Sequence, residues 1–403
     1  MTIFEKCVIF FRSLQLKLSC KRQENLNPKP EDTMGAMGIF MWGLFIMAAG
    51  CYVLFLTSDP MESLGTRLGK LLRLPEDVIA STFAAAATSG PEIVMAILAA
   101  TGAIMASQWN GLEVGERACS GTLNMSFSAM DNLLGIGAVA IVFMIFLKHV
   151  KKEDLIPRKP STIVGLGFYM VASFLFALFV NDNVLTYKEG WTLAVVGIVY
   201  VLAQFVIPYT INKYFPDDGG DGFEDDEEDD DDDEAPVPSL TKQPGAWSWD
   251  FVKTMFMYAA LVFALVIIVR EVMGATFDMG TTGYASVGGI LLLFTSYVSS
   301  FPEFMMSYRF AVAGKRAALL AMLFGSNVID LAFAGFRAIW LHEDMAVYTT
   351  GRFPELLPYY IWCLPVIAGL MLLLLLTRKL KWAHAYPMVA FYVIYIVSGF
   401  ILL

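Results

Sequence analysis

The sequence predicts an all-α polytopic membrane protein in which ten transmembrane helices form two inverted five-helix repeats. Three observations support this fold class: the composition, the number of long apolar stretches, and a polar motif that occurs once in each half. Of the 403 residues, 57% are hydrophobic and only 16% are charged, whereas soluble domains are usually about 45–50% apolar and about 25% charged. Functions that need a soluble pocket are therefore disfavoured, and we expect no enzymatic activity.

Ten stretches are long and apolar enough to cross a bilayer as helices, which takes about 19–20 residues. They lie near residues 38–57, 78–106, 122–147, 163–181, 191–214, 251–269, 281–308, 317–341, 356–377 and 383–403. An acidic tract, Glu224–Glu234 (EDDEEDDDDDE), separates the fifth stretch from the sixth and supplies much of the net charge of −10. Because this tract has no apolar surface to bury, we expect it to be disordered.

The acidic tract divides the chain into two halves. The expected parts are an N-terminal tail (1–35), a first five-helix repeat (36–214), an acidic disordered cytoplasmic loop (215–250) and a second five-helix repeat (251–403). Since five is odd, the second half enters the membrane with the opposite orientation to the first. Such inverted repeats are common in secondary transporters.

The loop charges predict the orientation. Most Lys and Arg residues lie in the loops after spans 1, 3, 5, 7 and 9, which the positive-inside rule places in the cytoplasm. The acidic loop is then cytoplasmic and both termini lie on the opposite side of a plasma membrane or a bacterial inner membrane. The basic tail 1–35 disagrees with this topology, and a targeting or processed segment would explain it.

A two-part polar signature occurs in corresponding spans of the two halves. The second span of each half carries TSGPE (Thr88–Glu92) or SSFPE (Ser299–Glu303). In the third span, a serine is followed four residues later by Asn or Asp; the two pairs are Ser128 with Asn132 and Ser326 with Asp330. A spacing of four places both side chains of a pair on one helix face.

This signature has the chemistry of a hard-cation site. Proline removes a backbone hydrogen bond, and the freed carbonyl is tolerated at membrane depth only against protein or water. A charged side chain at the bilayer centre costs roughly 2.5–3.5 kcal/mol on insertion scales. Glu92, Glu303 and Asp330 therefore need counter-cations, since no Lys or Arg lies deep in these spans. Carboxylate, carbonyl, hydroxyl and amide oxygens suit Ca²⁺ or Na⁺, and the five scattered cysteines indicate neither a zinc site nor disulfides.

ATSGPEIVMAILA and SSFPEFMMS…GSNVID resemble the two α-repeats of the cation/Ca²⁺ exchanger superfamily. The ten spans and the acidic loop after the fifth resemble its sodium/calcium exchanger branch. The resemblance implies an antiporter that moves Ca²⁺ against Na⁺ by alternating access, with both ions as transported substrates and no cofactor. The ligands that it implies are the oxygens of Glu92, Glu303, Asp330, Asn132, Thr88, Ser89, Ser299, Ser300, Ser128 and Ser326. In this pattern the glutamates serve both ions, Thr88 and Ser299 offer backbone oxygens to Ca²⁺, and the other four serines help to hold Na⁺.

The sequence departs from the family pattern in the first half. Phe127 stands where members usually have glycine, and Asp131 precedes Asn132. By its spacing to Gly137, Asp131 is an alternative candidate for the coordinating position. A fourth carboxylate would change the ion stoichiometry or allow proton coupling, and we keep Asp131 among the candidate metal ligands. The loop after span 5 is too short for the folded Ca²⁺-sensing domains of larger exchangers.

Several alternatives remain open at this stage. One alternative is K⁺-dependent exchange, because some family members with Asp at the position of Asp330 also carry K⁺. A divalent cation/H⁺ exchanger is another, although the GNA-x-E motif of proton-coupled relatives is absent. A channel or a transport-inactive scaffold is a third. The expected surroundings are a lipid bilayer and no nucleic acid, and the sequence leaves the oligomeric state open.

Overall fold

The computed structural model is helical through nearly all of the residues that it describes. These are residues 33–72, 76–90, 92–93, 127–156, 159–182, 184–214, 249–280, 296–346 and 353–402. The tail 1–32, the acidic tract and Pro91 lie outside the described residues, so the expectations about them stay predictions.

The described helices lie on both sides of the acidic tract. Those of the first half are α2 (Thr33–Leu72), α3 (Glu76–Ile79), η1 (Ala80–Ala84), α4 (Ala85–Thr88), η2 (Asp131–Gly137), α7 (Ala138–Phe146), α8 (Pro160–Phe179), η3 (Val180–Asp182) and α9 (Tyr187–Tyr214). Those of the second half are α10 (Trp249–Gly280), α12 (Ser296–Ser299), α13 (Phe301–Val312), α14 (Arg316–Phe333), α15 (Phe336–Leu341), α16 (Phe353–Leu376), η5 (Trp382–His384) and α17 (Ala385–Leu402). Two short strands, β1 (Val184–Leu185) and β2 (Met345–Ala346), pair antiparallel.

Four of the described helical segments are long and apolar enough to cross a membrane. They are Phe127–Phe146, Pro160–Asp182, Tyr187–Val206 and Arg316–Trp340. Shorter apolar helical stretches occur at Met37–Val53, Ile361–Leu376 and Trp382–Val397. The described part of the chain thus gives an integral, multi-pass helical membrane protein, and the count of ten spans stays a prediction.

Helix α2 is longer than expected. The sequence predicts a span over 38–57 and then a loop, but α2 runs unbroken through Pro60 to Leu72. At 1.5 Å per residue its 40 residues extend about 60 Å, twice the roughly 30 Å of a bilayer core. The second part, Pro60–Leu72, buries Met61 and Leu68 and leaves Arg67 exposed. It is an amphipathic continuation of the helix, which a search for uniformly apolar stretches does not detect.

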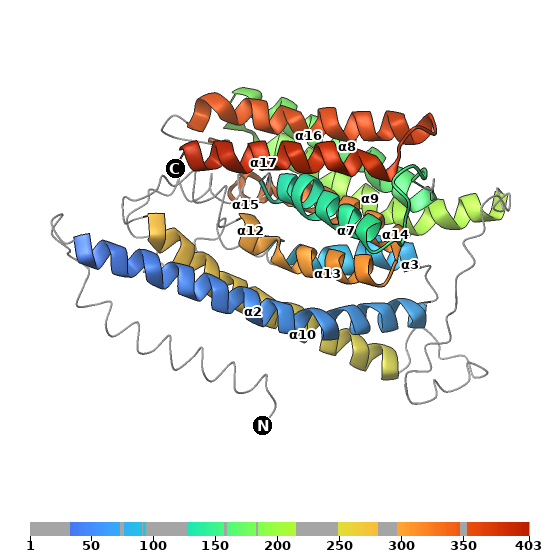
Figure 1. Cartoon of the computed structure of the whole chain (residues 1–403), viewed down its shortest axis with the longest axis horizontal. Coiled ribbons are helices and arrows are strands. Elements are labelled where there is room, and N and C mark those ends of the chain that lie inside the picture. The colour runs from blue at the N-terminus through green and yellow to red at the C-terminus, as the bar shows by residue number, and fades with distance from the viewer. Residues whose placement is uncertain are drawn as a thin grey trace.

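The helices form three layers in Figure 1. Helices α2 and α10 lie side by side along one face of the molecule, and α8 packs against α16 and α9 on the other. Between them lie α13, α14 and the η2–α7 segment, with α13 contacting α2 and α14 contacting both α8 and α9. The second and third spans of both halves therefore meet in the middle layer.

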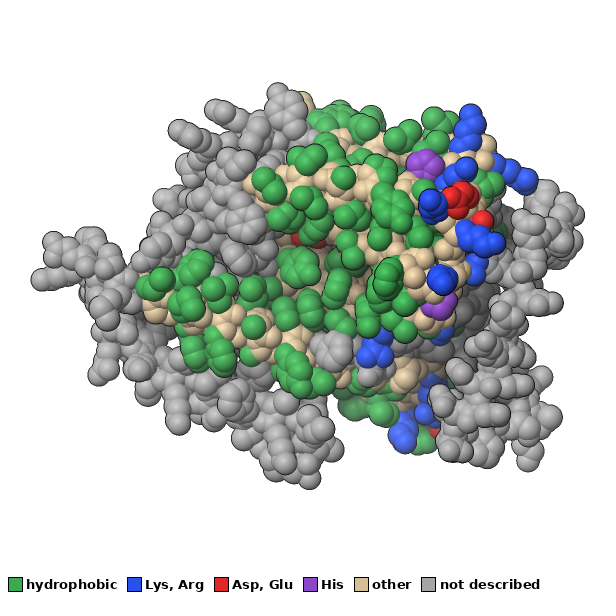
Figure 2. Space-filling model, viewed as in Figure 1, with side chains coloured by type: hydrophobic (Ala, Val, Ile, Leu, Met, Phe, Trp, Pro, Cys, Tyr) green, Lys and Arg blue, Asp and Glu red, His purple; other side chains and the backbone are tan. Residues whose placement is uncertain are grey.

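Loops that are expected to share a side of the membrane lie together. The loops before α8 and before α17 pair through a bridge between Leu155 and Lys381, and Gly314 lies against His149. At the other end of α8, β1 pairs with β2. Lys and Arg side chains gather at the Leu155 end (Figure 2).

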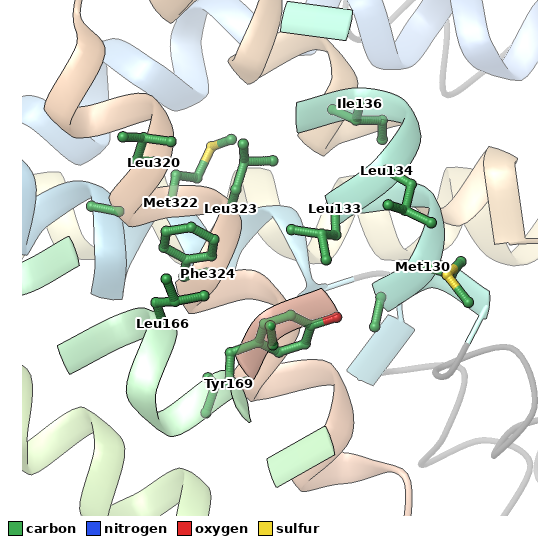
Figure 3. Packing of buried hydrophobic residues seen from close by; sticks show 14 of the residues in the cluster. Met130, Leu133, Leu134, Ile136, Leu166, Tyr169, Leu320, Met322, Leu323 and Phe324 are labelled. Atoms are coloured by element: carbon green, nitrogen blue, oxygen red, sulfur yellow. The ribbon is translucent and has the colours of Figure 1, made fainter. Parts of the chain in front are cut away.

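The apolar core holds the two third spans together. Leu133 of the first half points toward Leu323 of α14 in Figure 3, and Met130, Leu134 and Phe324 belong to the same buried cluster. A Cβ on Gly137 would come within 2.7 Å of a Leu323 methyl group. This close approach of η2 and α14 brings their polar residues together.

Candidate functional site

Both Ser-x-Pro-Glu elements interrupt a helix in the middle of the molecule. Helix α4 ends at Thr88 and α12 ends at Ser299, and the next residue in each case leaves the helical range, with ψ of 1° at Ser89 and 6° at Ser300. Pro302 lies in the first turn of α13, where its missing N–H has no helical partner to lose. In the second half, proline thus lies in the first turn of a new helix and does not kink a continuous one.

Thr88 and Ser299, the last residues before the two breaks, are hydrogen-bonded in the same way. Thr88 Oγ1 donates to the Ala85 carbonyl at 3.1 Å, and Ser299 Oγ donates to the Ser296 carbonyl at 2.9 Å. The two hydroxyls therefore make equivalent bonds within their own helices. The Thr88 side chain also lies within hydrogen-bond reach of the Glu303 carboxylate.

Two chains of hydrogen bonds cross between the halves. Ser89 Oγ lies 2.7 Å from Ser326 Oγ, which donates to Glu303 Oε1 at 2.9 Å. A hydroxyl has one proton to donate, so the second proton of this chain comes from Ser89. The order is serine of the first half, serine of the second half, glutamate of the second half.

The other chain is the inverted image of the first. Ser300 Oγ lies 2.5 Å from Ser128 Oγ, which donates to Glu92 Oε1 at 3.0 Å. Here the order is serine of the second half, serine of the first half, glutamate of the first half. Each half therefore supplies the hydroxyl that orders the other half's serine and glutamate.

Asn132 and Asp330 close the site from the third spans. The Asn132 amide nitrogen donates to Asp330 Oδ2 and to Ser326 Oγ, each at 3.4 Å. The side chains of both residues are fully buried, as are those of Glu92 and Glu303. These four residues and the serine pairs form the central site.

The central site has more acceptor oxygens than partners. Glu92 Oε2, Glu303 Oε2, Asp330 Oδ1 and Asn132 Oδ1 are all buried and accept no hydrogen bond. The three carboxylates lie close enough to repel one another, and within the described ranges no Lys or Arg pairs with them. Since buried charges are stable only when they are compensated, this arrangement is suited to bind cations.

Carboxylates alone do not complete a metal site. Among the described residues, no three His, Cys, Asp or Glu side chains are grouped so as to hold an ion by themselves. A cation bound here would take further oxygens from the serines, from Asn132 and from the interrupted backbone. Such a mixed oxygen set is suited to Ca²⁺ and Na⁺.

Asp131, the second candidate that the sequence left open, lies beside the central site and not within it. Its Oδ2 accepts a 2.7 Å hydrogen bond from Ser296 Oγ, and the Tyr392 hydroxyl of α17 lies within hydrogen-bond reach. Neighbouring residues of a helix point in different directions, so only Asn132 faces Asp330. In this structure Asn132 contacts Asp330 and Asp131 contacts Ser296, and which of the two coordinates an ion stays a prediction.

Sequence reasoning missed four polar residues near these groups, of which three are buried and Tyr392 is partly buried. Ser296 and Tyr392 surround Asp131. Tyr169 of α8 interacts electrostatically with Asp330, and its ring lies beside α14 in Figure 3. Asn327 is fully buried and both of its amide atoms lack partners. Asn327 follows Ser326 within the quoted GSNVID motif, and this was the only available signal for any of the four.

The arrangement agrees with the comparisons to known proteins. The family profile described as sodium/calcium exchanger protein matches residues 41–206 and 251–400, which are the two helical halves without the acidic loop. The chain belongs to the sodium/calcium exchanger family. Phe127, which departs from the usual glycine of that family, is buried in the core of this member.

Solved structures of the sodium-calcium exchanger NCX_Mj have the same fold. The forms soaked with 2.5 mM or 100 mM Na⁺ and 10 mM Sr²⁺ each give a TM-score of 0.55 at 15% identity, covering 91% of this chain and 99% of that one. A form soaked with 2.5 mM Na⁺ and 0.1 mM Ca²⁺ gives a TM-score of 0.53 at 16% identity. The match covers 90% of this chain and 98% of that one. No curated protein sequence matches the chain significantly.

Proposed function

We propose that the chain is a secondary active antiporter that exchanges Na⁺ for Ca²⁺ by alternating access. The transport site lies near the bilayer midplane, where Glu92 and Glu303 are the central carboxylates. Ten transmembrane helices in two inverted repeats, 36–214 and 251–403, surround it. The family and the fold of its solved members support this assignment.

The observation that carries the proposal is the pair of crossed hydrogen-bond chains. Each glutamate is ordered by a serine of its own half, and that serine is bonded to a serine of the other half. A movement of one half relative to the other therefore changes the ligands of both glutamates. Alternating access requires such a dependence of the site on the relative position of the repeats.

The charge of the site suits exchange between unlike cations. Glu92, Glu303 and Asp330 offer three carboxylates to one Ca²⁺ or to several Na⁺ ions. Ca²⁺ accepts six to eight oxygens in flexible geometry, which the serine and backbone oxygens supply. Na⁺ ions would use the same glutamates together with the flanking serine pairs, so the two ions compete.

The orientation belongs to the same proposal. The end of the molecule with the Leu155–Lys381 bridge and the gathered Lys and Arg side chains is cytoplasmic. The acidic loop 215–250 begins after α9 and ends at α10, and it lies on that side. Both termini and the β1–β2 pair are on the opposite side.

Transport measurements distinguish this function from its alternatives. We expect Na⁺-loaded proteoliposomes of the full chain to take up radioactive Ca²⁺ when an outward Na⁺ gradient is imposed. Glu92→Gln keeps the shape of the side chain and removes its charge, and loss of a charged ligand is worth about 1.5–3 kcal/mol. The apparent Ca²⁺ affinity should fall roughly 10- to 100-fold. Glu153→Gln is the matched control, since Glu153 is an exposed loop residue.

Each outcome assigns one function. Gradient-dependent uptake that Glu92→Gln weakens and Glu153→Gln leaves unchanged supports the antiporter. Uptake that a pH gradient drives and Na⁺ does not affect would replace it with divalent cation/H⁺ exchange. Uptake that also needs K⁺ would make the exchange K⁺-dependent. Absence of uptake under every gradient would support a scaffold.

A further inference from the structure

Asp131 is a buried carboxylate that the central site does not use. Its side chain is fully buried, and its Oδ1 has no hydrogen-bond partner. Ser296 donates to the other oxygen, and the Tyr392 hydroxyl lies close by. None of the described Lys or Arg side chains interacts with it. When Asp131 is ionised, its negative charge thus has hydroxyl groups but no cationic side chain beside it among the described residues.

The inverted repeat shows that the fold does not need this charge. When Asn132 is aligned with Asp330, Asp131 corresponds to Ile329; when Ser299 is aligned with Thr88, Ser296 corresponds to Ala85. Ile329 and Ala85 are both buried. The contact between Asp131 and Ser296 thus corresponds, in the inverted half, to two apolar side chains. The two polar residues occur together on one side of the site and are absent together on the other.

Helix α17 approaches η2 closely beside the Asp131 carboxylate. A Cβ on Gly135 would come within 2.5 Å of the Tyr392 ring, so a glycine is needed for α17 to approach η2 here. Gly135 lies one turn beyond Asp131 along η2. Its lack of a side chain therefore allows the Tyr392 hydroxyl to reach the carboxylate.

We propose that Asp131, Ser296 and Tyr392 bind one additional monovalent alkali cation beside the central site. The inference rests on the proposed function and adds one coupled ion to it. A single carboxylate with neutral hydroxyls balances one positive charge, whereas a divalent ion would leave a buried excess of +1. Hydroxyl and carboxylate oxygens are ligands for hard cations. The asymmetry between the halves places this extra ion on one side of the central site only.

The test measures how many monovalent ions are coupled to each Ca²⁺. In proteoliposomes of the full chain, the Na⁺ gradient that stops net Ca²⁺ movement against a fixed Ca²⁺ gradient gives this ratio. The balance point does not depend on the transport rate, so it remains measurable in a slow variant. It is determined with Na⁺ alone, with added K⁺, and both with and without a pH gradient. We expect Asp131→Asn to couple one Na⁺ or K⁺ fewer per Ca²⁺ than the wild type.

Two milder variants keep the test decisive if Asp131→Asn does not fold. Ser296→Ala and Tyr392→Phe each remove one neutral ligand, so the half-saturating Na⁺ or K⁺ concentration should rise roughly three- to ten-fold. Ile329→Val, at the inverted position, is the matched control and should leave this concentration unchanged. An unaltered coupling ratio in Asp131→Asn would overturn the proposal, and so would a ratio that changes only with a pH gradient. Failure of the wild type to respond to Na⁺ would instead reject the proposed function itself.

Discussion

Four serines carry the cross-connections of the site at the scale of single residues. Ser128 and Ser300 come from different halves, and their hydroxyls are hydrogen-bonded to each other. Ser89 and Ser326 make the equivalent contact. In each chain, the serine from the same half as the glutamate donates to the carboxylate. Ser128 donates to Glu92, and Ser326 donates to Glu303. Ser300 acts through Ser128, whereas Ser89 Oγ also lies 3.4 Å from Glu303 Oε1.

Two serines that act through one another should not give additive effects. Ser128→Ala and Ser300→Ala each remove a hydroxyl worth about 0.5–1.5 kcal/mol, so each should raise the half-saturating Na⁺ concentration roughly three- to ten-fold. The double variant should cost less than the sum, with a coupling energy of at least about 0.5 kcal/mol. Titration of Ca²⁺ uptake with Na⁺ gives the half-saturating Na⁺ concentration of both single variants and of the double variant. Ser173→Ala, a buried serine bonded to its own helix, is the control, and strict additivity would contradict the chain.

Helix elements are positioned by close backbone contacts as well as by apolar side chains. Gly190, at the start of α9, lies against Gly335 before α15, where an added Cβ would come within 2.8 Å of the Gly335 carbonyl oxygen. In contrast, an added Cβ at Gly167 of α8 would meet nothing within 4 Å. The first contact fixes α9 against the segment that follows α14.

Gly190→Ala should therefore destabilise the protein. Backbone cannot rotate away as a side chain can, and overpacking costs about 1–3 kcal/mol. Gly167→Ala should be neutral or stabilise by up to about 1 kcal/mol, because alanine favours a helix. Thermal unfolding in detergent compares the two variants. Equal melting temperatures would show that α9 is not held by this contact.

Much of the helical framework was predictable because apolar runs and helices coincide. The expected span 356–377 corresponds to α16, and 191–214 corresponds to most of α9. The amphipathic end of α2 was missed since its hydropathy resembles that of a loop. The choice between Asp131 and Asn132 depends on the rotation of η2, which hydropathy does not determine. Ser296 and Tyr392 are isolated polar residues in apolar spans, and their meeting with Asp131 is a tertiary contact that no local pattern indicates.

The whole molecule has two distinct ends. One holds the paired loops of Leu155 and Lys381, and the other holds the β1–β2 pair. Lys379 is exposed at the first end, and Lys188 is exposed at the start of α9 near the second. If the first end is cytoplasmic, these two lysines lie on opposite sides of the membrane.

Labelling from one side tests this orientation. In a chain whose five cysteines are replaced, Lys379→Cys should react with an impermeant thiol reagent only from the cytoplasmic side. Lys188→Cys should react only from the outside. The two substitutions are chemically identical, so each is the control for the other. Labelling of both from the same side would refute the two-ended arrangement, and the reverse pattern would invert the proposed topology.

The central claim is that the two inverted halves build one shared cation site. Equilibrium binding of radioactive Ca²⁺ to the purified full chain in detergent tests it most directly. We expect Na⁺ to compete with Ca²⁺, and Glu92→Gln and Glu303→Gln each to lower the Ca²⁺ affinity at least about ten-fold. An unchanged Ca²⁺ affinity in either variant would show that the two glutamates do not share one site. Failure of Na⁺ to displace Ca²⁺ would show that the two ions do not bind at the same place.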